Sequence, residues 1–283
     1  MDALQFAAAL GSALLHAGWN ALVKSSPTPR AAMAASMLGS AILSAVALLW
    51  IGLPALATVP WMAVSTGLNL LAVMSLLRAY ESGPFGTVYP IARAVSVLGV
   101  ALLSPLLTRE WMGGGALAGV ALVVAALAML AFDARRAAAA GGGGFTPRSL
   151  AWTLVAGGVT ALYVFADAQA SRAGGSVAAY GCAVSITNAL AMAWRSRDLG
   201  TPFALLRDHW HIALPTAFAS MASYLLILWV WSAAPIAPAA ALRDTSAIFA
   251  MLIAVFWMRE ALGPRRLVAV ALALAGVPLL RLG

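Results

Sequence analysis

Apolar stretches of similar length recur along the whole chain, separated by short segments that contain proline, glycine or charged residues. Each stretch has about 20 residues, the length that an α-helix needs to cross roughly 30 Å of hydrocarbon. The pattern therefore predicts an all-α integral membrane protein with ten transmembrane helices. The predicted spans are Ala3–Val23, Ala32–Leu53, Trp61–Tyr80, Thr87–Leu107, Gly113–Phe132, Ser149–Ala170, Ser176–Trp194, His211–Trp231, Ala237–Trp257 and Gly263–Leu280.

The ten stretches fall into two sets of five. Between the sets lies Asp133–Arg148, DARRAAAAGGGGFTPR, whose four consecutive glycines are typical of a flexible connection. We therefore predict a first five-helix repeat over residues 1–132, an Ala- and Gly-rich linker over 133–148, and a second five-helix repeat over 149–283.

The two sets also resemble each other in sequence. Arg93–Glu110 reads RAVSVLGVALLSPLLTRE and Arg243–Glu260 reads RDTSAIFAMLIAVFWMRE, and the two match at five of eighteen positions at a constant offset of 150. Because five is an odd number of spans, the second copy must enter the membrane in the opposite direction. Such inverted repeats are typical of secondary transporters, whose substrates bind near the midplane between the copies.

The composition agrees with a membrane protein and excludes other classes. Hydrophobic residues make up 63% of the chain and charged residues only 9%, whereas a soluble domain has about 25% charged residues. The mean hydropathy is +0.93. Because basic residues collect in the short loops of membrane proteins, the net charge of +8 does not indicate a nucleic-acid partner.

Basic residues are distributed unevenly between the two sides that the spans define. Twelve lie in or near the loops that follow odd-numbered spans, and three lie on the other side. The positive-inside rule then places the twelve in the cytoplasm and both termini outside. We expect a monomeric, multi-pass protein of the cell inner (plasma) membrane, surrounded by membrane lipid.

Two arginines, Arg93 and Arg243, lie inside predicted spans. Each is six residues past the start of its span, or about 9 Å. A charge at that depth is costly unless it is paired or faces an aqueous cavity, so each arginine is a candidate functional residue. The alternative interpretation is a structural ion pair between helices, and the sequence leaves both open.

Three polar or aromatic residues interrupt the first apolar stretch in a helical pattern. His16, Trp19 and Asn20 share one face of a helix because they are three and four residues apart. His16 lies about 20 Å into its span, and so about 10 Å from the far face, where the fourth span begins. His16 and Arg93 are therefore predicted to lie at the same depth.

The second half repeats this scheme with Tyr163 and Asp167, which are four residues apart and near the predicted depth of Arg243. The two polar layers would lie on opposite sides of the midplane, as the gates of an alternating-access carrier require. Asp244 follows Arg243 and points about 100° away from it on a helix. Asp167 is therefore the expected partner of Arg243, and Arg93 has no acid at its depth within any span.

An intramembrane arginine without a fixed acid suits a transient carboxylate or another anionic group. Our hypothesis from the sequence is that Arg93 holds the anionic end of a substrate. Arg243 and Asp167, with Asp244 beside them, would close a gate. The sequence leaves open whether a proton is coupled to transport through His16 or Asp167.

Other residues could complete the substrate-binding cavity, although Tyr and Trp near the ends of spans are also typical of the interfacial belt. His209 and His211 bracket Trp210 just before the eighth span and make a poor metal site. No phosphate-binding loop, HExxH motif or nucleophile elbow occurs, so we expect no cofactor and no enzymatic activity. The additional cavity candidates are Tyr80, Tyr89, Ser96, Tyr224 and Trp231, with weaker signals at Asn69 and Asn188.

The chain resembles the drug/metabolite transporter superfamily, EamA type. The resemblance rests on ten spans in two halves, Pro84 and Pro235 in the turns before the fourth and ninth spans, and Glu110 and Glu260 at the ends of those spans. Residues 16–24, HAGWNALVK, are similar to the opening of bacterial members. The resemblance implies a basket of ten helices around a central cavity, alternating access, and export of amino acids or related metabolites.

The resemblance further implies that the first, third, fourth, sixth, eighth and ninth spans line the cavity. The small multidrug members of the superfamily carry a glutamate in their first span, where this chain has His16 and Asn20. Export of cationic drugs is therefore not expected. A permease for phosphonates or other anionic metabolites suits Arg93 as well as an amino acid exporter does.

Two further classes compete with a carrier. An integral-membrane enzyme that modifies lipids would need acid, base or metal groups clustered at one interface, whereas the predicted ionisable groups are divided about the midplane. A passive channel would show flux without saturation or exchange, and a gate-like pair argues against it. The sequence fixes neither the substrate nor the direction of transport.

Overall fold

The computed structural model describes residues 1–81, 83, 85–140, 146–258 and 264–281, and these residues form helices and turns without a β-strand. The α-helices are connected by short segments, two of which contain the 3₁₀ helices η1 (Leu56–Thr58) and η2 (Arg197–Leu199). The α-helices are α1 (Ala3–Ser25), α2 (Pro29–Ile51), α3 (Val59–Glu81), α4 (Phe85–Leu107), α5 (Gly114–Ala140), α6 (Pro147–Arg172), α7 (Val177–Arg195), α8 (Pro202–Ala233), α9 (Ile236–Asp244), α10 (Ser246–Met258) and α11 (Pro264–Arg281).

Polar residues between the apolar stretches determine where several helices begin. The Asp2 carboxylate accepts a hydrogen bond from the Gln5 backbone, and the Gln5 side chain accepts one from the Asp2 backbone. Thr146, Ser176 and Thr201 each accept a hydrogen bond from the backbone N–H three residues further on, at the starts of α6, α7 and α8. These caps satisfy N–H groups that have no partner within the helix.

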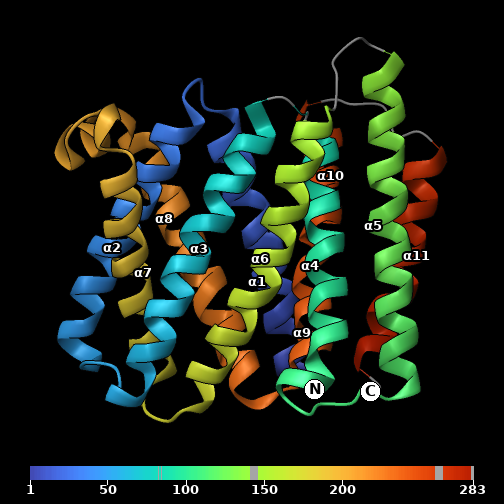
Figure 1. The fold of residues 1–283 in the computed structure, drawn as a ribbon, viewed down its shortest axis with the longest axis horizontal. Helices are drawn as coiled ribbons and strands as arrows, with labels where there is room; N and C mark the ends of the chain where they lie inside the picture. The colour runs from blue at the N-terminus through green and yellow to red at the C-terminus, as the bar shows by residue number, and fades with distance from the viewer. Residues whose placement is uncertain (82, 84, 141–145, 259–263, 282–283) are drawn as a thin grey trace.

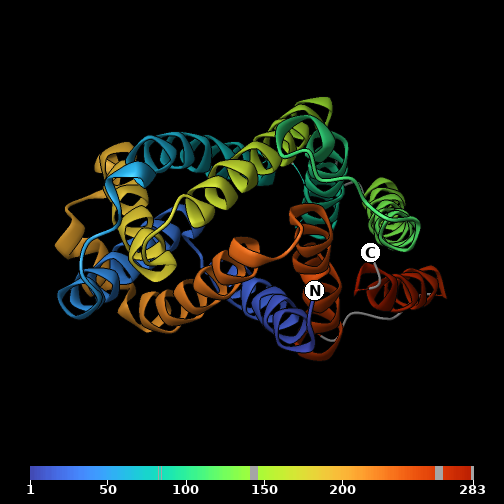
Figure 2. The ribbon, with the colours of Figure 1, turned by 90° about the horizontal axis from the view of Figure 1, so that it is seen from below.

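The helices run up and down across a single layer (Figure 1). The N-terminus and the end of α11 lie at the same edge, which we call the lower edge, and α1 rises from it toward the upper edge. Seen from below, α5 and α11 form a packed pair at one end of the molecule, and α2, α7 and α8 lie at the other end (Figure 2). Helices α1, α3, α4, α6 and α9 lie between these two groups.

The outward-facing surface is apolar, as a lipid-facing surface must be. Large side chains such as Trp50, Leu102, Leu106 and Trp111 are exposed. Among the described residues, six helices are long and apolar enough to cross a membrane: α1, α2, α3 extended by η1, α6, α7 and α8. Two shorter apolar segments, 91–107 and 114–129, lie within α4 and α5. The chain is thus an all-α protein of membrane type, as the sequence predicts.

Three predicted boundaries differ from the structure. Helix α8 begins at Pro202, nine residues before the predicted start at His211, because Thr201 caps it there. The ninth predicted span is divided into α9 and α10 at Thr245, so one apolar stretch forms two helices placed end to end. Helix α5 continues to Ala140, so the first half of the predicted 133–148 linker is helical, because alanines favour a helix and the glycines come only after them. Residues 141–145, Pro84 and Glu260 lie outside the described residues.

Candidate functional site: a buried polar cavity

A cavity of about 150 Å³, taken as the space in which the centres of water-sized molecules fit, lies among the central helices. Its lining residues on α1, α2 and α4 lie in the halves of those helices nearer the upper edge. The wall consists of His16, Trp19, Asn20, Met33, Ser36, Met37, Ser40, Asn69, Ala72, Val73, Leu76, Ala92, Arg93, Ala156, Thr160, Tyr163, Ser185, Asn188, Ser220, Met221, Tyr224 and Arg243.

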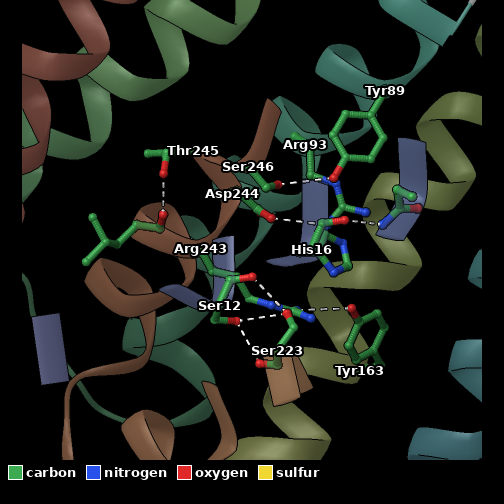
Figure 3. Close-up of polar contacts among 12 residues, drawn as sticks. Ser12, His16, Tyr89, Arg93, Tyr163, Ser223, Arg243, Asp244, Thr245 and Ser246 are labelled. Carbon is green, nitrogen blue, oxygen red and sulfur yellow. Dashed lines mark hydrogen bonds and ion pairs between the residues drawn. The ribbon is translucent and has the colours of Figure 1, made fainter. Parts of the chain in front are cut away.

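Arg93 of α4 forms a buried ion pair with Asp244 at the end of α9 (Figure 3). The Arg93 Nη1 atom lies 3.1 Å from Asp244 Oδ1, and both side chains are less than 10% exposed. The Arg93 guanidinium also lies 5.0 Å from the ring centre of Tyr89, whose hydroxyl is 3.1 Å from Ser246 Oγ of α10. Arg93 is therefore held between a carboxylate and an aromatic face.

Arg243 of α9 is buried beside the same cavity but has a different environment. Its Nη1 atom donates a long hydrogen bond of 3.4 Å to the Tyr163 hydroxyl, and its guanidinium lies 5.6 Å from the ring centre of Trp231. Its Nε atom, like that of Arg93, is buried without a hydrogen-bond partner among the described residues. Within that part of the chain, no carboxylate lies within ion-pair distance of Arg243.

Two carboxylates lie near the described wall: Asp244 is bonded to Arg93, and Asp167 is held by hydroxyls that include that of the wall residue Tyr224. Among the described residues, neither lies within ion-pair distance of Arg243. A buried cation is costly unless something pairs with it. The positive charge of Arg243 therefore favours an anionic group in the cavity.

His16, Trp19 and Asn20 share one face of α1 and all line the cavity, as the sequence predicts. The Asn20 amide donates a 2.8 Å hydrogen bond to the His16 carbonyl, and the His16 and Trp19 rings meet edge to face at 5.2 Å. The His16 ring lies between Arg93 and Arg243 (Figure 3). Its Nε2 atom is buried without a hydrogen-bond partner among the described residues.

Asp167 is the centre of a separate network, four residues beyond Tyr163 on α6 toward the lower edge. Its Oδ1 atom accepts hydrogen bonds from Ser65 of α3 and from the Tyr180 hydroxyl of α7 at 2.8 Å. Its Oδ2 atom accepts one from the Tyr224 hydroxyl of α8 at 2.8 Å. Asp167 is 1% exposed and is not part of the cavity wall. It ties four helices together without an arginine.

The structure thus corrects the predicted pairing. Arg93 has a fixed acid, Asp244, and Arg243 does not pair with Asp167. The two polar layers predicted on opposite sides of the midplane are a single site, since Arg93, Arg243, His16 and Tyr163 line one cavity. Arg93 therefore fits the alternative interpretation, a structural ion pair between helices.

The physical reason lies in depth. Arg93 is eight residues into α4 and Arg243 is seven residues into α9 from the opposite edge, so each lies about 11–12 Å deep. Two such depths leave only about 7 Å of a roughly 30 Å hydrocarbon layer, which long side chains can cross. Asp244 does point away from Arg243, as predicted, but it points toward Arg93.

Below the cavity, a group of contacts that we call the lower clasp joins the connections at the lower edge. Arg172 at the end of α6 pairs with Glu110, which follows α4. Arg172 also donates to the carbonyls of Trp231 at 2.9 Å and Ala234 at 2.8 Å. The Glu110 Oε2 atom accepts a 2.8 Å hydrogen bond from the backbone of Ile236, the first residue of α9.

The remaining predicted site residues divide into two groups. Tyr163 and Tyr224 line the cavity, whereas Tyr80, Tyr89, Ser96 and Trp231 do not. Tyr89, Ser96 and Trp231 are buried behind the wall, where the Tyr89 and Trp231 rings support the two arginines. The Tyr80 ring lies 5.1 Å from the Lys24 ammonium. Tyr89 and Trp231 thus support the site without lining it.

Sequence reasoning missed the contribution of α2, and on α7 it named Asn188 only as a weaker candidate. Along α2, Ser36 and Ser40 line the cavity and pair with hydroxyls of α8: Ser36 Oγ lies 2.6 Å from Thr216 Oγ1, and Ser40 Oγ lies 3.1 Å from Ser220 Oγ. The signal was the spacing of Ser36, Ser40 and Ser44 at four-residue intervals, which predicts a polar stripe on one helix face. The α7 wall includes Asn188.

No family model matches the chain, and no curated protein matches its sequence. Among solved structures, a crystal structure described only as that of a protein is similar, with a TM-score of 0.72 and 17% sequence identity. The match covers 99% of this chain and 96% of the other. The likeness therefore extends over the whole fold, and at this identity it carries no information on substrate or activity.

Proposed function

We propose that this protein is a secondary transporter that moves small metabolites carrying an anionic group across the membrane by alternating access. Amino acids are the first candidates and export is the proposed direction. The observation that carries the proposal is Arg243, a buried guanidinium in the cavity wall without a carboxylate partner among the described residues. Phosphonates are the second candidate, because a guanidinium binds carboxylate and phosphonate oxygens alike.

We also propose that the chain is a ten-helix member of the drug/metabolite transporter superfamily, EamA type, with α9 and α10 forming one interrupted span. Helix α3 packs against α6 in the same way that α8 packs against α1, and α4 contacts α6 as α9 and α10 contact α1. These paired contacts support an inverted repeat in which α1–α5 correspond to α6–α11. Interrupted helices at the binding site are typical of such repeats.

In the conformation of this structure, the cavity lies nearer the upper edge. Toward the lower edge, the Asp167 network and the lower clasp hold helices of both halves together. The ends of α1, α3 and α7 at the upper edge carry Lys24, Arg78 and Arg195, respectively. Under the positive-inside rule the upper edge is cytoplasmic, and the cavity would then receive its substrate from the cytoplasm.

The test uses the purified protein in liposomes with labelled leucine, phenylalanine, 2-aminoethylphosphonate and tetraphenylphosphonium. We expect saturable counterflow of an amino acid or of the phosphonate. Arg243→Ala should reduce it by at least about tenfold, because a charge-assisted hydrogen bond contributes about 1.5–3 kcal/mol.

The matched control is Arg148→Ala, which removes an exposed arginine near the start of α6 and should leave counterflow unchanged. Two results would contradict the proposal. One is flux of tetraphenylphosphonium that Arg243→Ala leaves unchanged. The other is flux that neither saturates nor shows counterflow, because a channel behaves in that way.

A further inference from the structure

The cavity has a second group of polar atoms that the arginines do not satisfy. Asn69 of α3 and Asn188 of α7 both line the wall. The Oδ1 atom of each is buried and has no hydrogen-bond donor among the described residues. Buried carbonyl oxygens are nearly always hydrogen-bonded in folded proteins, so two such acceptors in one cavity require an explanation.

The two amides are brought to the same part of the wall by a contact between their helices. The hydroxyls of Thr66 on α3 and Thr187 on α7 lie 2.6 Å apart. Asn69 is one turn beyond Thr66, and Asn188 follows Thr187. Helices α3 and α7 lie on the opposite side of the cavity-lining group from α9, which carries Arg243 (Figures 1 and 2).

The cavity thus has two chemically different ends. The end formed by α1, α4 and α9 offers guanidinium groups, and the end formed by α3 and α7 offers amide oxygens that lack donors. The described wall contains no aspartate or glutamate, so an ammonium group on a ligand would have to be received by neutral oxygens. Nearby Ser185 already uses its hydroxyl on the Gly181 carbonyl at 2.9 Å.

We propose that Asn69 and Asn188 form a subsite that accepts the N–H donors of the substrate's amino group, opposite Arg243. This inference rests on the proposed function and sharpens it, because it predicts that zwitterionic solutes are preferred over matching anions without an amine. A solute with only an anionic group leaves both amide oxygens without a donor, and an unmade buried hydrogen bond lowers affinity.

The experiment compares solutes that differ only in the amine: leucine against 4-methylpentanoate, and 2-aminoethylphosphonate against ethylphosphonate. Binding to the purified protein is measured by calorimetry, with counterflow in liposomes as the second readout. The wild-type protein should prefer the amino member of at least one pair by about tenfold or more, as expected for hydrogen bonds to a charged group.

Asn69→Leu and Asn188→Leu remove the acceptors at similar volume and should abolish the preference by weakening the amino member alone. Asn188→Asp keeps the acceptors and adds a negative charge, so it should keep or enlarge the preference. Leu190→Ala, which shortens an exposed side chain of the same helix outside the cavity wall, is the control and should change nothing. Size-exclusion profiles and melting temperatures establish that each variant is folded before it is compared.

The outcomes separate this inference from the proposed function. If both members of each pair bind equally to the wild type, or if the Asn→Leu variants keep the preference, the subsite is wrong, and loss of binding in Arg243→Ala still supports an anion carrier. If no solute binds to the wild type or to Arg243→Ala, the proposed function fails, and the subsite fails with it.

Discussion

Arg93 and Arg243 stand at equivalent positions in the two halves of the sequence, yet their surroundings differ. Arg93 is paired with Asp244 at 3.1 Å and lies against Tyr89, whereas Arg243 has one long hydrogen bond to Tyr163 and the face of Trp231. Each arginine thus has an aromatic neighbour, but only one has an acid.

The difference begins at the next residue. Asp244 follows Arg243, but Ala94 follows Arg93. Because adjacent residues on a helix point in different directions, the carboxylate of the second half reaches the arginine of the first half. Under the proposed repeat, one differing residue thus gives two matching arginines different surroundings, one with a carboxylate in contact and one without.

The largest effect is expected when the ion pair is broken on one side. Asp244→Leu leaves Arg93 buried without its carboxylate, and we expect a loss of about 3–5 kcal/mol in the free energy of unfolding. Removing both charges with Arg93→Met and Asp244→Leu should restore most of that loss, since apolar pairs often replace buried ion pairs without cost. Thermal melting in detergent measures both; equal melting temperatures for the single and double variants would contradict a structural role for Arg93.

A smaller effect tests whether Arg243 is independent of Asp167. Asp167→Asn disturbs three hydroxyl donors and should cost about 1–3 kcal/mol. In a double-mutant cycle with Arg243→Ala, the coupling energy should be under about 1 kcal/mol, because the two side chains share no direct contact. A coupling energy of several kcal/mol would instead support the ion pair between Arg243 and Asp167 that the sequence suggested.

The smallest effect concerns an ion pair at the surface, which contrasts with the buried one. Desolvation opposes ionisation of Asp198 in η2, but hydrogen bonds from Arg30 outweigh it and lower the pKa of Asp198 below its ordinary value. The pair therefore contributes stability above the unfolded pKa of about 3.9, and this is lost as the pH falls through the lower folded pKa. Arg30→Ala should therefore melt slightly below the wild type at pH 6, and this difference should shrink as the pH falls to 3. A large difference at neutral pH would contradict the small contribution expected of a surface pair.

The helical organisation could be read from the chain because apolar length and period depend on local sequence. Helices α1, α2, α3, α6 and α7 begin and end within a few residues of the predicted spans. The break at Thr245 was not predictable from hydropathy, since the apolar stretch continues through it. Helix breaks of this kind depend on packing and on contacts such as that between Tyr89 and Ser246.

The site was predictable in part of its membership but not in its pairings. Helical spacing predicted that His16, Trp19 and Asn20 share a face, and they do line the cavity. Pairing depends on where side chains of different helices meet. A depth counted in residues is uncertain by a distance as large as the length of an arginine side chain, so it cannot decide which groups pair. Asn69 and Asn188 gave only a weak signal because an amide has no obligatory partner until its surroundings are known.

The lower clasp has a mechanical consequence. Glu110 is bonded to Ile236 at the first residue of α9, and Arg243 and Asp244 lie in the last turn of the same helix. Helix α9 has nine residues, a rod of about 14 Å, so releasing its lower end would tilt the rod and move both charges together. By reciprocity, a ligand bound to Arg243 would change the stability of the hydrogen bond between Glu110 and Ile236 by the same free energy. Under the proposed function, α9 would thus couple the ligand site to the lower edge.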